Sequence, residues 1–340
     1  MLSKAARYPT LLVWGIALLG LSIMTLYGLV LADPAGVMKV QPVRVPFSML
    51  SPGHGVDKPG TWYASITGDI ERREITSAEL DEQFELIDYR LAEVRSGDLA
   101  VPRLFVANLP VDLGGVSVID ARKQLFLQTT LPLVLRVNEM ILEERGRLLT
   151  AQQRIDAGET LSARETQWLA DLAGHYETGP GDLEALLLRI DIVPPSLALA
   201  QAVTESGWGT SRFVREGNAL FGERVFAEGG GVVPHERSEQ DDYEVRVFPS
   251  LIASVQAYAH NLNTHPAYRG FRAERARLRA ASELLTGRAL LGGLEAYSEQ
   301  GARYVKTLRH VIRDNSLWQF DTARLHGVEF AAVTAIGDDS

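Results

Sequence analysis

Apolar residues follow three patterns along the chain. An unbroken apolar run extends from Leu11 to Ala32 without a charged residue, and at about 1.5 Å per residue it would reach about 33 Å, enough to cross a bilayer core of about 30 Å. From residue 76 onward, apolar positions recur three and four apart, which is typical of amphipathic helices. A short alternation from Tyr243 to Phe248 predicts a β-hairpin. Together these patterns predict a mostly α protein of the α+β class, preceded by a single N-terminal transmembrane helix.

Charges near the apolar run predict its orientation. Lys4 and Arg7 precede it, so the positive-inside rule places residues 1–10 in the cytoplasm and the rest of the chain on the periplasmic side of the inner membrane. The alternative is a signal peptide cleaved after Ala32, which would release a periplasmic protein. The run is longer than the usual apolar region of a signal peptide, about 7–15 residues, and this favours an uncleaved anchor over residues 11–32.

Residues 33–100 are expected to form a stalk and a linker helix. Scattered prolines and glycines before residue 75 indicate extended pieces without helical periodicity. Thr76 and Glu79 form a capping-box pattern, and Gly97 is a natural helix stop. Between these signals, apolar residues with 4-3-4-3 spacing predict one continuous helix: Leu80, Phe84, Ile87, Leu91 and Val94.

Residues 101–320 are predicted to form one mostly helical domain, followed by a C-terminal tail at 321–340. Pro132 marks a kink or break in the first long helix of this domain. The β-hairpin falls within residues 225–248. Caps and apolar periodicity predict helices at 119–148, from Ser162, at 183–190 after Asp182, from Pro195, at 250–261, at 271–285 and at 300–313.

Composition excludes several functions. The 340 residues carry 34 Lys and Arg against 43 Asp and Glu, a net charge of −9, and an acidic surface disfavours binding to nucleic acid. The chain has no cysteine, which excludes disulfide scaffolds, thiolate metal sites and cysteine nucleophiles. His235, His260, His265 and His310 lack the spacing of metal ligands, so we expect neither a metal nor another cofactor.

One basic segment stands out in this acidic chain, at Arg269, Arg272, Arg275, Arg277, Arg279 and Arg288. Arg272, Arg275 and Arg279 fall on one face of the predicted helix. Two interpretations are open, a solvated helix face or a contact with anionic wall polymer or lipid headgroups. We favour the solvated face, because long charged side chains are mostly exposed.

Glu205 is the strongest candidate for chemistry. It ends a helix that starts at Pro195 and is apolar on almost every side, and Gly207-Trp208-Gly209 breaks that helix. Burial of a carboxyl group raises its pKa and keeps it protonated near neutral pH, as a general acid requires. Lysozyme holds its acid against a tryptophan in this manner. The alternative is a solvated helix end or a structural ion pair.

The residues around Glu205 resemble a known signature. Gln201-Ala-x-x-Glu205-Ser-Gly-Trp-Gly209, followed by Asn218-x-Leu-Phe-Gly222, is similar to the motif of bacterial endo-β-N-acetylglucosaminidases. These are peptidoglycan-cleaving enzymes of the glycoside hydrolase family 73 type, and the similarity is greatest to their Bax-like branch. It extends from about residue 102 to about residue 315 and includes three further blocks, Leu131–Val134, Asn263–Arg269 and Tyr297–Arg309.

This resemblance implies a lysozyme-like fold, with an α lobe, a small β-hairpin lobe and a groove for a glycan strand. It implies that Glu205 is the catalytic acid and that Tyr304 lines the groove near it, the alternative being a half-buried core tyrosine. Trp208 and Phe221 either hold the turn after the helix or contact sugar, and packing is favoured for both. The substrate-binding residues expected from the resemblance are Tyr304, Trp208, Ser206, Phe221 and Asn218.

The family is expected to supply a second carboxylate from the β lobe. Five acidic residues lie there: Glu236, Glu239, Asp241, Asp242 and Glu244. Alternation along the predicted hairpin favours Glu236 or Glu239 as the catalytic partner of Glu205. Carboxyl groups about 5–5.5 Å apart would indicate a retaining mechanism, and about 6.5–9.5 Å an inverting one. The acetamido group of the substrate offers a third route.

The resemblance therefore predicts a peptidoglycan hydrolase that cleaves β-1,4 bonds after N-acetylglucosamine, with Glu205 as general acid. Its partners would be peptidoglycan glycan strands and, through residues 11–32, the inner membrane. One alternative is a lytic transglycosylase, which also places Glu-Ser at a helix end but leaves an anhydro sugar. Another is a tethered wall-binding protein without turnover. The block from Asn218 to Gly222 favours the glucosaminidase.

Overall fold

The computed structural model describes residues 75–225, 231–233 and 243–327. The predicted cytoplasmic tip, transmembrane helix, proline-rich stalk and C-terminal tail beyond residue 327 lie outside the described residues. The expectations for those segments therefore stay predictions.

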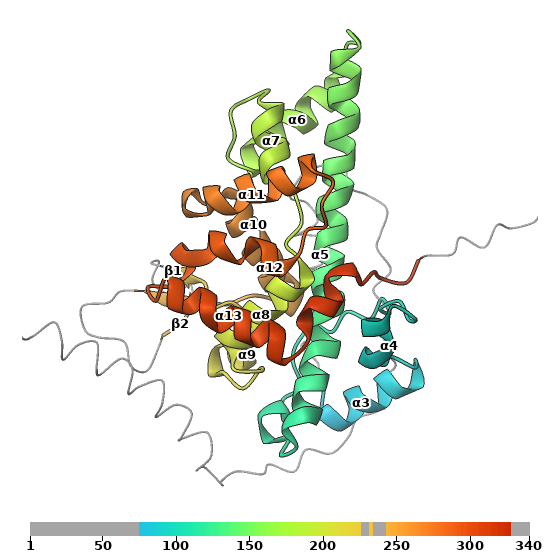
Figure 1. The fold of residues 1–340 in the computed structure, drawn as a ribbon, viewed down its shortest axis with the longest axis vertical. Coiled ribbons are helices and arrows are strands. Elements are labelled where there is room, and N and C mark those ends of the chain that lie inside the picture. Colours follow the sequence, from blue (N-terminus) through green and yellow to red (C-terminus); the bar gives the residue numbers. More distant parts are fainter. Residues whose placement is uncertain (1–74, 226–230, 234–242, 328–340) are drawn as a thin grey trace, which may run out of the picture. The chain divides into compact units, whose positions relative to one another are not determined.

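The described chain is mostly helical with one small sheet, as predicted (Figure 1). The α-helices are α3 (Ser77–Leu86), α4 (Leu91–Ser96), α5 (Ile119–Asp156), α6 (Ala163–His175), α7 (Leu183–Arg189), α8 (Pro195–Ser206), α9 (Arg212–Gly217), α10 (Leu251–Thr264), α11 (Arg269–Ala280), α12 (Gly287–Leu290) and α13 (Ala302–Asp314). The 3-10 helices are η1 (Leu113–Gly115), η2 (Pro266–Tyr268), η3 (Leu291–Tyr297) and η4 (Leu317–Thr322).

Helix α8 is the buried helix of the core. It begins at Pro195, where the fixed backbone angle of proline suits a helix start. Every residue from Pro195 to Val203 is buried, and the helix packs against α5, α12, α13 and η4. A helix covered on all sides needs apolar residues on all sides, which explains its composition. The last turn of α8, which carries Glu205, therefore projects from a rigid support.

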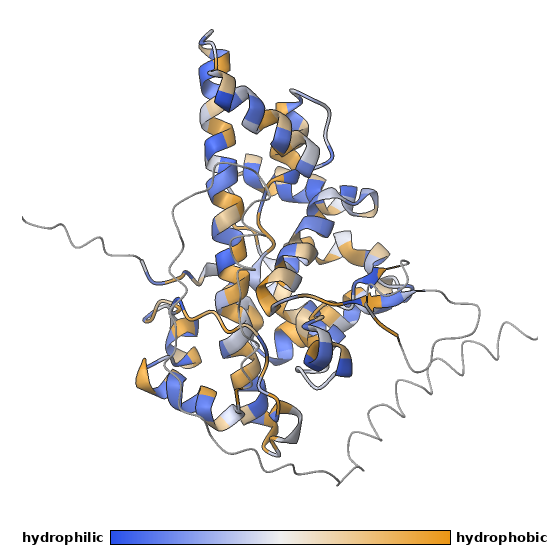
Figure 2. Cartoon of the chain, turned by 180° about the vertical axis from the view of Figure 1, so that it is seen from behind, coloured by the Kyte–Doolittle hydropathy of each residue, from blue (hydrophilic) through white to orange (hydrophobic). Residues whose placement is uncertain are grey.

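Helix α5 is the longest element and packs against the core along most of its length (Figures 1 and 2). It passes through Pro132 without a break and continues to Asp156, beyond the predicted end at residue 148. Among the described helices, α5 alone is long and apolar enough to cross a membrane, but 83% of its most apolar stretch is buried inside the protein. Core packing therefore accounts for the apolar surface of α5. The predicted membrane anchor is a different segment, residues 11–32.

Three short strands form the sheet: β1 (Arg224–Val225), β2 (Gly231–Val232) and β3 (Glu244–Arg246). Their order is β1-β3-β2, and both outer strands are antiparallel to β3. The predicted β element is confirmed as the pairing of β2 with β3. Only glycine fits at position 231, because a Cβ atom there would come within 2.1 Å of the Val245 carbonyl oxygen. Strand β1 lies at the start of the predicted interval, and the sequence did not predict it as a third strand.

The local capping predictions are confirmed. Thr76 with Glu79 forms a capping box at the start of α3, and Ser162 with Glu165 forms another at the start of α6. The Asp182 side chain accepts a hydrogen bond from the backbone N–H of Ala185 at the start of α7. Each cap depends on residues three positions apart, so sequence alone contains the information.

The prediction of one continuous linker helix is wrong, because the segment forms two helices, α3 and α4. Asp88 adopts a left-handed conformation (φ 55°), and the Tyr89 N–H donates to the Phe84 carbonyl across the end of α3. This turn buries Tyr89 edge-on against Phe84, with ring centroids 5.4 Å apart. The apolar spacing continues in phase across the break and so could not reveal it. Both helices contribute to the same hydrophobic core as α8.

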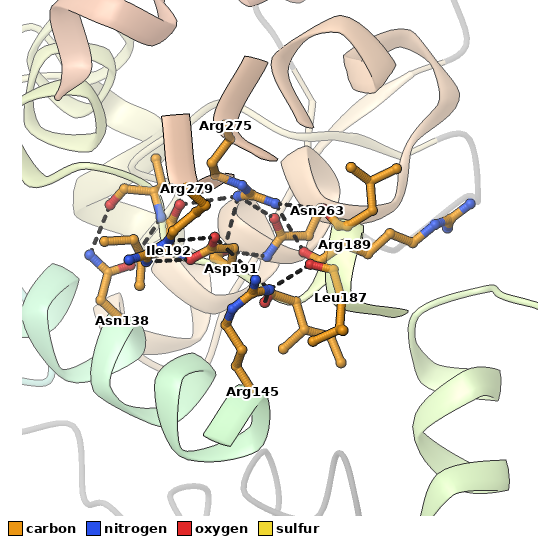
Figure 3. A network of polar contacts seen from close by, with 12 residues as sticks. Asn138, Arg145, Leu187, Arg189, Asp191, Ile192, Asn263, Arg275 and Arg279 are labelled. Atoms are coloured by element: carbon orange, nitrogen blue, oxygen red, sulfur yellow. Dashed lines mark hydrogen bonds and ion pairs between the residues drawn. The ribbon is translucent and has the colours of Figure 1, made fainter. Parts of the chain in front are cut away.

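The expectation of a solvated arginine face on α11 is also wrong. Arg272 is 2% exposed and Arg275 is fully buried. Arg275 donates hydrogen bonds to the backbone carbonyls of Asp191 and Ile192 and to Asn263 Oδ1, at 2.8–3.0 Å (Figure 3). Burial lowers the pKa of Arg275 to about 10, so it remains charged at neutral pH. The guanidinium group offers five fixed donors, which suits it to cross-link several backbone segments.

A single carboxylate lies beside the buried Arg275 and the partly exposed Arg279. Asp191 lies between α7 and α8, and its side chain is 3% exposed. Arg279 donates to both of its oxygens, at 2.7 and 3.0 Å, and Arg145 of α5 approaches to 4.0 Å (Figure 3). We call Asp191 with Arg145, Arg275 and Arg279 the Asp191 network. It joins α5, α11 and the segment after α7, so its role in this fold is structural.

Candidate active site

Glu205 occupies the last turn of α8, and an unusual turn follows it. Gly207, Trp208 and Gly209 all have left-handed backbone angles, with φ of 58°, 59° and 78°. The Ser206 hydroxyl secures this turn, since it donates to the Ala202 carbonyl at 2.6 Å and accepts from the Gly209 N–H at 3.0 Å. The turn therefore ends α8 directly after Glu205 and leaves that side chain at the edge of the core.

Gly209 is required for packing as well as for conformation. A Cβ atom at this position would lie 2.7 Å from Leu109 Cδ1 and 2.8 Å from Leu113 Cδ2. We expect Gly209→Ala to lower the free energy of unfolding by about 2–4 kcal/mol, from backbone strain and overpacking together. Gly97→Ala is the matched control, because Gly97 also has a positive φ, of 86°, but has nothing within 4 Å of the added atom. Urea denaturation should show a clearly smaller loss for Gly97→Ala, and equal losses would contradict the packing argument.

Within the described residues, one oxygen of the Glu205 carboxyl group has a hydrogen-bond partner. The Tyr304 hydroxyl of α13 donates to Glu205 Oε1 at 2.7 Å. The other oxygen, Oε2, lies 3.9 Å from the position of a Cβ atom on Gly222, an exposed residue with φ of 63°. Burial raises the pKa of Glu205, and the hydrogen bond from Tyr304 opposes this rise. The predicted pKa perturbation is therefore present in the structure.

Tyrosine rings surround Glu205. Tyr297 stacks on Tyr304 with centroids 5.6 Å apart, and Tyr258 stacks on Phe221 at 3.9 Å. Burial raises the pKa of Tyr258 and Tyr297 well above the ordinary value, and the nearby Glu205 charge adds to the rise. The hydroxyl groups therefore stay protonated and can donate hydrogen bonds at every pH at which the protein would act.

The tryptophan of the motif packs against the core, the role that the sequence favoured for it. The Trp208 ring packs edge-on against Phe126 of α5, with centroids 5.9 Å apart, and Lys123 Nζ lies 5.1 Å above it. The aromatic groups around the Glu205 carboxyl are thus tyrosines of α10, η3 and α13. Burial of Glu205 has the physical effect that the likeness to lysozyme predicts, and tyrosines supply aromatic groups near it.

Four of the five residues expected to bind substrate, Tyr304 and the three that follow here, are buried and have partners within the protein. Ser206 is fully buried in the turn described above. Asn218 ends α9 in a left-handed conformation (φ 52°) and donates to the Phe248 carbonyl at 3.2 Å. Phe221 is 5% exposed under Tyr258. These three side chains hold the walls of the site, which agrees with packing as the favoured role of Phe221. Trp208 remains partly exposed.

Tyr304 combines the two roles that the sequence left open. It is only 4% exposed, as a core residue would be, yet its hydroxyl contacts the Glu205 carboxyl directly. It is therefore a partner of the acid. Sequence reasoning did not single out Tyr258, Tyr297 or the side-chain contact of Gln201. Gln201 stands four residues before Glu205, on the same helix face, and that spacing is the signal that could have found it.

Among the described residues, the β segment offers no free carboxylate next to Glu205. Glu244 Oε2 accepts a hydrogen bond from the Gly231 N–H at 2.7 Å within the sheet. The predicted second acids, Glu236 and Glu239, lie outside the described residues. Across residues 75–225, 231–233 and 243–327, no group of three His, Asp or Glu side chains could hold a metal ion.

This arrangement is suited to acid catalysis. A carboxyl group with a raised pKa, one oxygen held by a tyrosine and the other beside an exposed glycine can deliver a proton to a bound molecule. Residues 184–317 match the sequence profile of the glucosaminidase family, described as mannosyl-glycoprotein endo-beta-N-acetylglucosaminidase. Fold, site and profile together define a protein of the glycosidase class.

A curated relative specifies the branch. The chain is 36% identical over 200 residues to Protein bax of Escherichia coli (strain K12), covering 57% of this chain and 70% of the relative. The chain therefore belongs to the bacterial Bax-like glucosaminidase family. No solved structure matches the chain at a significant level.

Proposed function

We propose that this protein hydrolyses peptidoglycan at the β-1,4 bond after N-acetylglucosamine, with Glu205 as general acid. The observation that carries the proposal is the Glu205 carboxyl at the end of a buried helix, with its pKa raised by burial and one oxygen bound to Tyr304. Membership of the Bax-like glucosaminidase family supports the substrate class. The uncharged sugar backbone of such a substrate requires no basic surface, in keeping with the net charge of −9.

In the proposed reaction, Glu205 donates its proton to the glycosidic oxygen while the bond from that oxygen to the anomeric carbon breaks. The carbon then takes up the oxygen of water, either directly or after transient attack by the carbonyl oxygen of the substrate's own acetamido group. In the direct route the second carboxylate takes the proton of that water and Glu205 is reprotonated from solvent; in the route through the acetamido group the Glu205 carboxylate takes the proton of the incoming water. We propose Glu236 or Glu239 as the carboxylate that orients the water or the acetamido group, and Trp208 as a contact for sugar.

We propose that residues 11–32 anchor the protein in the inner membrane with the glucosaminidase domain in the periplasm, the alternative being signal cleavage after Ala32. The uncharged apolar run and the preceding Lys4 and Arg7 support the anchor. We expect a C-terminally tagged full-length protein to stay with membranes after carbonate extraction and to keep its N-terminal residues. A soluble periplasmic product that begins after residue 32 would contradict the anchor and favour the cleaved form.

Product analysis tests the proposed reaction. Purified full-length protein in detergent is incubated with peptidoglycan sacculi, and the new glycan ends are identified by mass spectrometry. Reducing N-acetylglucosamine ends are expected. Anhydromuramic ends would contradict the proposal and indicate a lytic transglycosylase. Binding to sacculi without release of fragments would indicate a wall-binding protein without turnover.

A further inference from the structure

A chain of hydrogen bonds extends from Glu205 into the core. The Tyr304 hydroxyl donates to Glu205 Oε1 at 2.7 Å, and the Gln201 amide Nε2 donates to the Tyr304 oxygen at 3.0 Å. The Tyr258 hydroxyl in turn donates to Gln201 Oε1 at 2.7 Å. Gln201 is fully buried and Tyr258 is 3% exposed. This hydrogen-bond chain thus links four residues from α8, α10 and α13. Its inner end, at Tyr258, is closed to solvent.

Each of the three hydrogen bonds is donated in the direction of Glu205, and the Tyr258 hydroxyl determines that direction. In the described residues, the hydrogen bond of the Tyr258 hydroxyl is the one to Gln201 Oε1. If the Gln201 amide turned over, its NH₂ group would face the Tyr258 hydroxyl, and that buried hydroxyl proton would lose its acceptor. A buried donor without an acceptor costs free energy, so this orientation is disfavoured. The amide therefore presents Nε2 to Tyr304, and the Tyr304 proton must point to Glu205.

The direction of these hydrogen bonds determines which oxygen of Glu205 carries the acidic proton. Oε1 accepts a hydrogen bond from Tyr304, and in a protonated carboxyl group the carbonyl oxygen is a stronger acceptor than the hydroxyl oxygen. The acidic proton is therefore favoured on Oε2, the oxygen beside the exposed Gly222. We propose that Gln201 and Tyr258 are positioning residues that keep the acidic proton of Glu205 on Oε2, the oxygen from which it can reach a ligand. This proposal rests on the proposed role of Glu205 as general acid.

Removal of the Tyr258 hydroxyl tests the proposal. Tyr258→Phe keeps the ring stacked on Phe221 and deletes only the group that orients Gln201. The amide can then turn over and accept the Tyr304 proton, and a protonated Glu205 can donate from Oε1 to the Tyr304 oxygen. The protonated form of Glu205 gains a partner, so its pKa should rise. The misplaced proton should lower the rate of fragment release roughly threefold to tenfold, the size of one hydrogen bond.

Two measurements separate this effect from general damage to the site. Carbon NMR titration of labelled glutamate side chains, with Glu205 assigned by its loss in Glu205→Gln, reports the pKa of Glu205 whether or not the protein cleaves sacculi. The pH profile of fragment release reports the same group in the active protein, as its alkaline limb. In Tyr258→Phe, both should move to higher pH. In the Tyr304→Phe background, Tyr258→Phe should cause no further shift, because the effect passes through Tyr304.

Tyr297→Phe is the matched control for the titration. It removes a hydroxyl group that also lies near Glu205. That hydroxyl donates to the Phe221 carbonyl and takes no part in the hydrogen-bond chain from Tyr258 to Glu205. It should leave the pKa of Glu205 unchanged. An unshifted Glu205 in Tyr258→Phe, or an additive shift in the double variant, would overturn the positioning role. Because the titration needs no substrate, a failure of the proposed glycosidase reaction would show separately, as absent cleavage by the wild-type protein.

Discussion

Glu205→Gln is expected to lower the initial rate of glycan cleavage by a factor of about 10²–10⁴, the usual contribution of a positioned general acid. The glutamine side chain has the same shape and can still accept the hydrogen bond from Tyr304, but it has no acidic proton to give. The local structure therefore stays intact while the chemical step loses its proton donor. The rate is measured as release of soluble fragments from sacculi by the full-length protein in detergent, at several pH values.

A control is needed for a charge change in the same part of the chain. Glu216→Gln removes the charge of an exposed glutamate of α9, whose partner Arg212 lies 3.4 Å away. This variant should cleave at nearly the wild-type rate. Retention of more than a tenth of the rate by Glu205→Gln would show that another group supplies the proton. A fall in binding to sacculi without a fall in rate of the bound protein would argue for a role in substrate contact.

Asp191→Asn is expected to cause the largest loss of stability, about 3–5 kcal/mol in the free energy of unfolding, as found when one partner of a buried ion pair is removed. The change removes the charge that faces Arg275 and the two charged hydrogen bonds from Arg279. Desolvation of the fully buried Arg275 is then no longer compensated by an anion. Urea denaturation followed by circular dichroism measures the loss. Asp314→Asn, which removes an exposed carboxylate paired with Arg313, is the control and should barely move the midpoint.

The pH dependence of this effect follows from the pKa of Asp191. Burial tends to raise that pKa, but the hydrogen bond from Arg279 and the charges of Arg275, Arg145 and Arg279 outweigh burial and hold it below the ordinary value. A lowered pKa in the folded state stabilises the fold above the ordinary pKa of about 3.9, and this stability is lost as pH falls through the lower folded value. The difference between wild type and Asp191→Asn should therefore be full at pH 6–7 and shrink below about pH 4. A constant difference across this range would contradict an ionic role.

The break between α3 and α4 illustrates the limit of periodicity. The spacing of Leu80, Phe84, Leu91 and Val94 fits one helix as well as two. What separates the helices is the burial of Tyr89 against Phe84 and the left-handed backbone of Asp88. Tertiary packing compensates the cost of that conformation, and a single aspartate in the sequence gives no sign of it.

The arginines of α11 show the same limit for charge. Their spacing correctly places Arg272 and Arg275 on one helix face. A charged face is normally solvated, so the sequence favours exposure. Arg272 donates to the carbonyls of Leu262 and His265, 10 and 7 positions away. Burial of Arg275 becomes possible because backbone carbonyls after α7 accept its hydrogen bonds from 83 and 84 positions away, while the Asp191 carboxylate pairs with Arg279, 88 positions away. No local pattern contains such a separation.

By itself, the sequence determined the buried helix α8, its end at Gly207, the helix caps and the candidate acid Glu205. These features depend on residues within one or two turns of each other, where propensity and spacing are informative. Only the tertiary structure decided that Tyr304 binds Glu205 and that Tyr258 orients Gln201, since these contacts join residues 99 and 57 positions apart. Hydrogen bonds depend on distance and angle in space, so the partners of the acid follow from the packing of α8, α10 and α13.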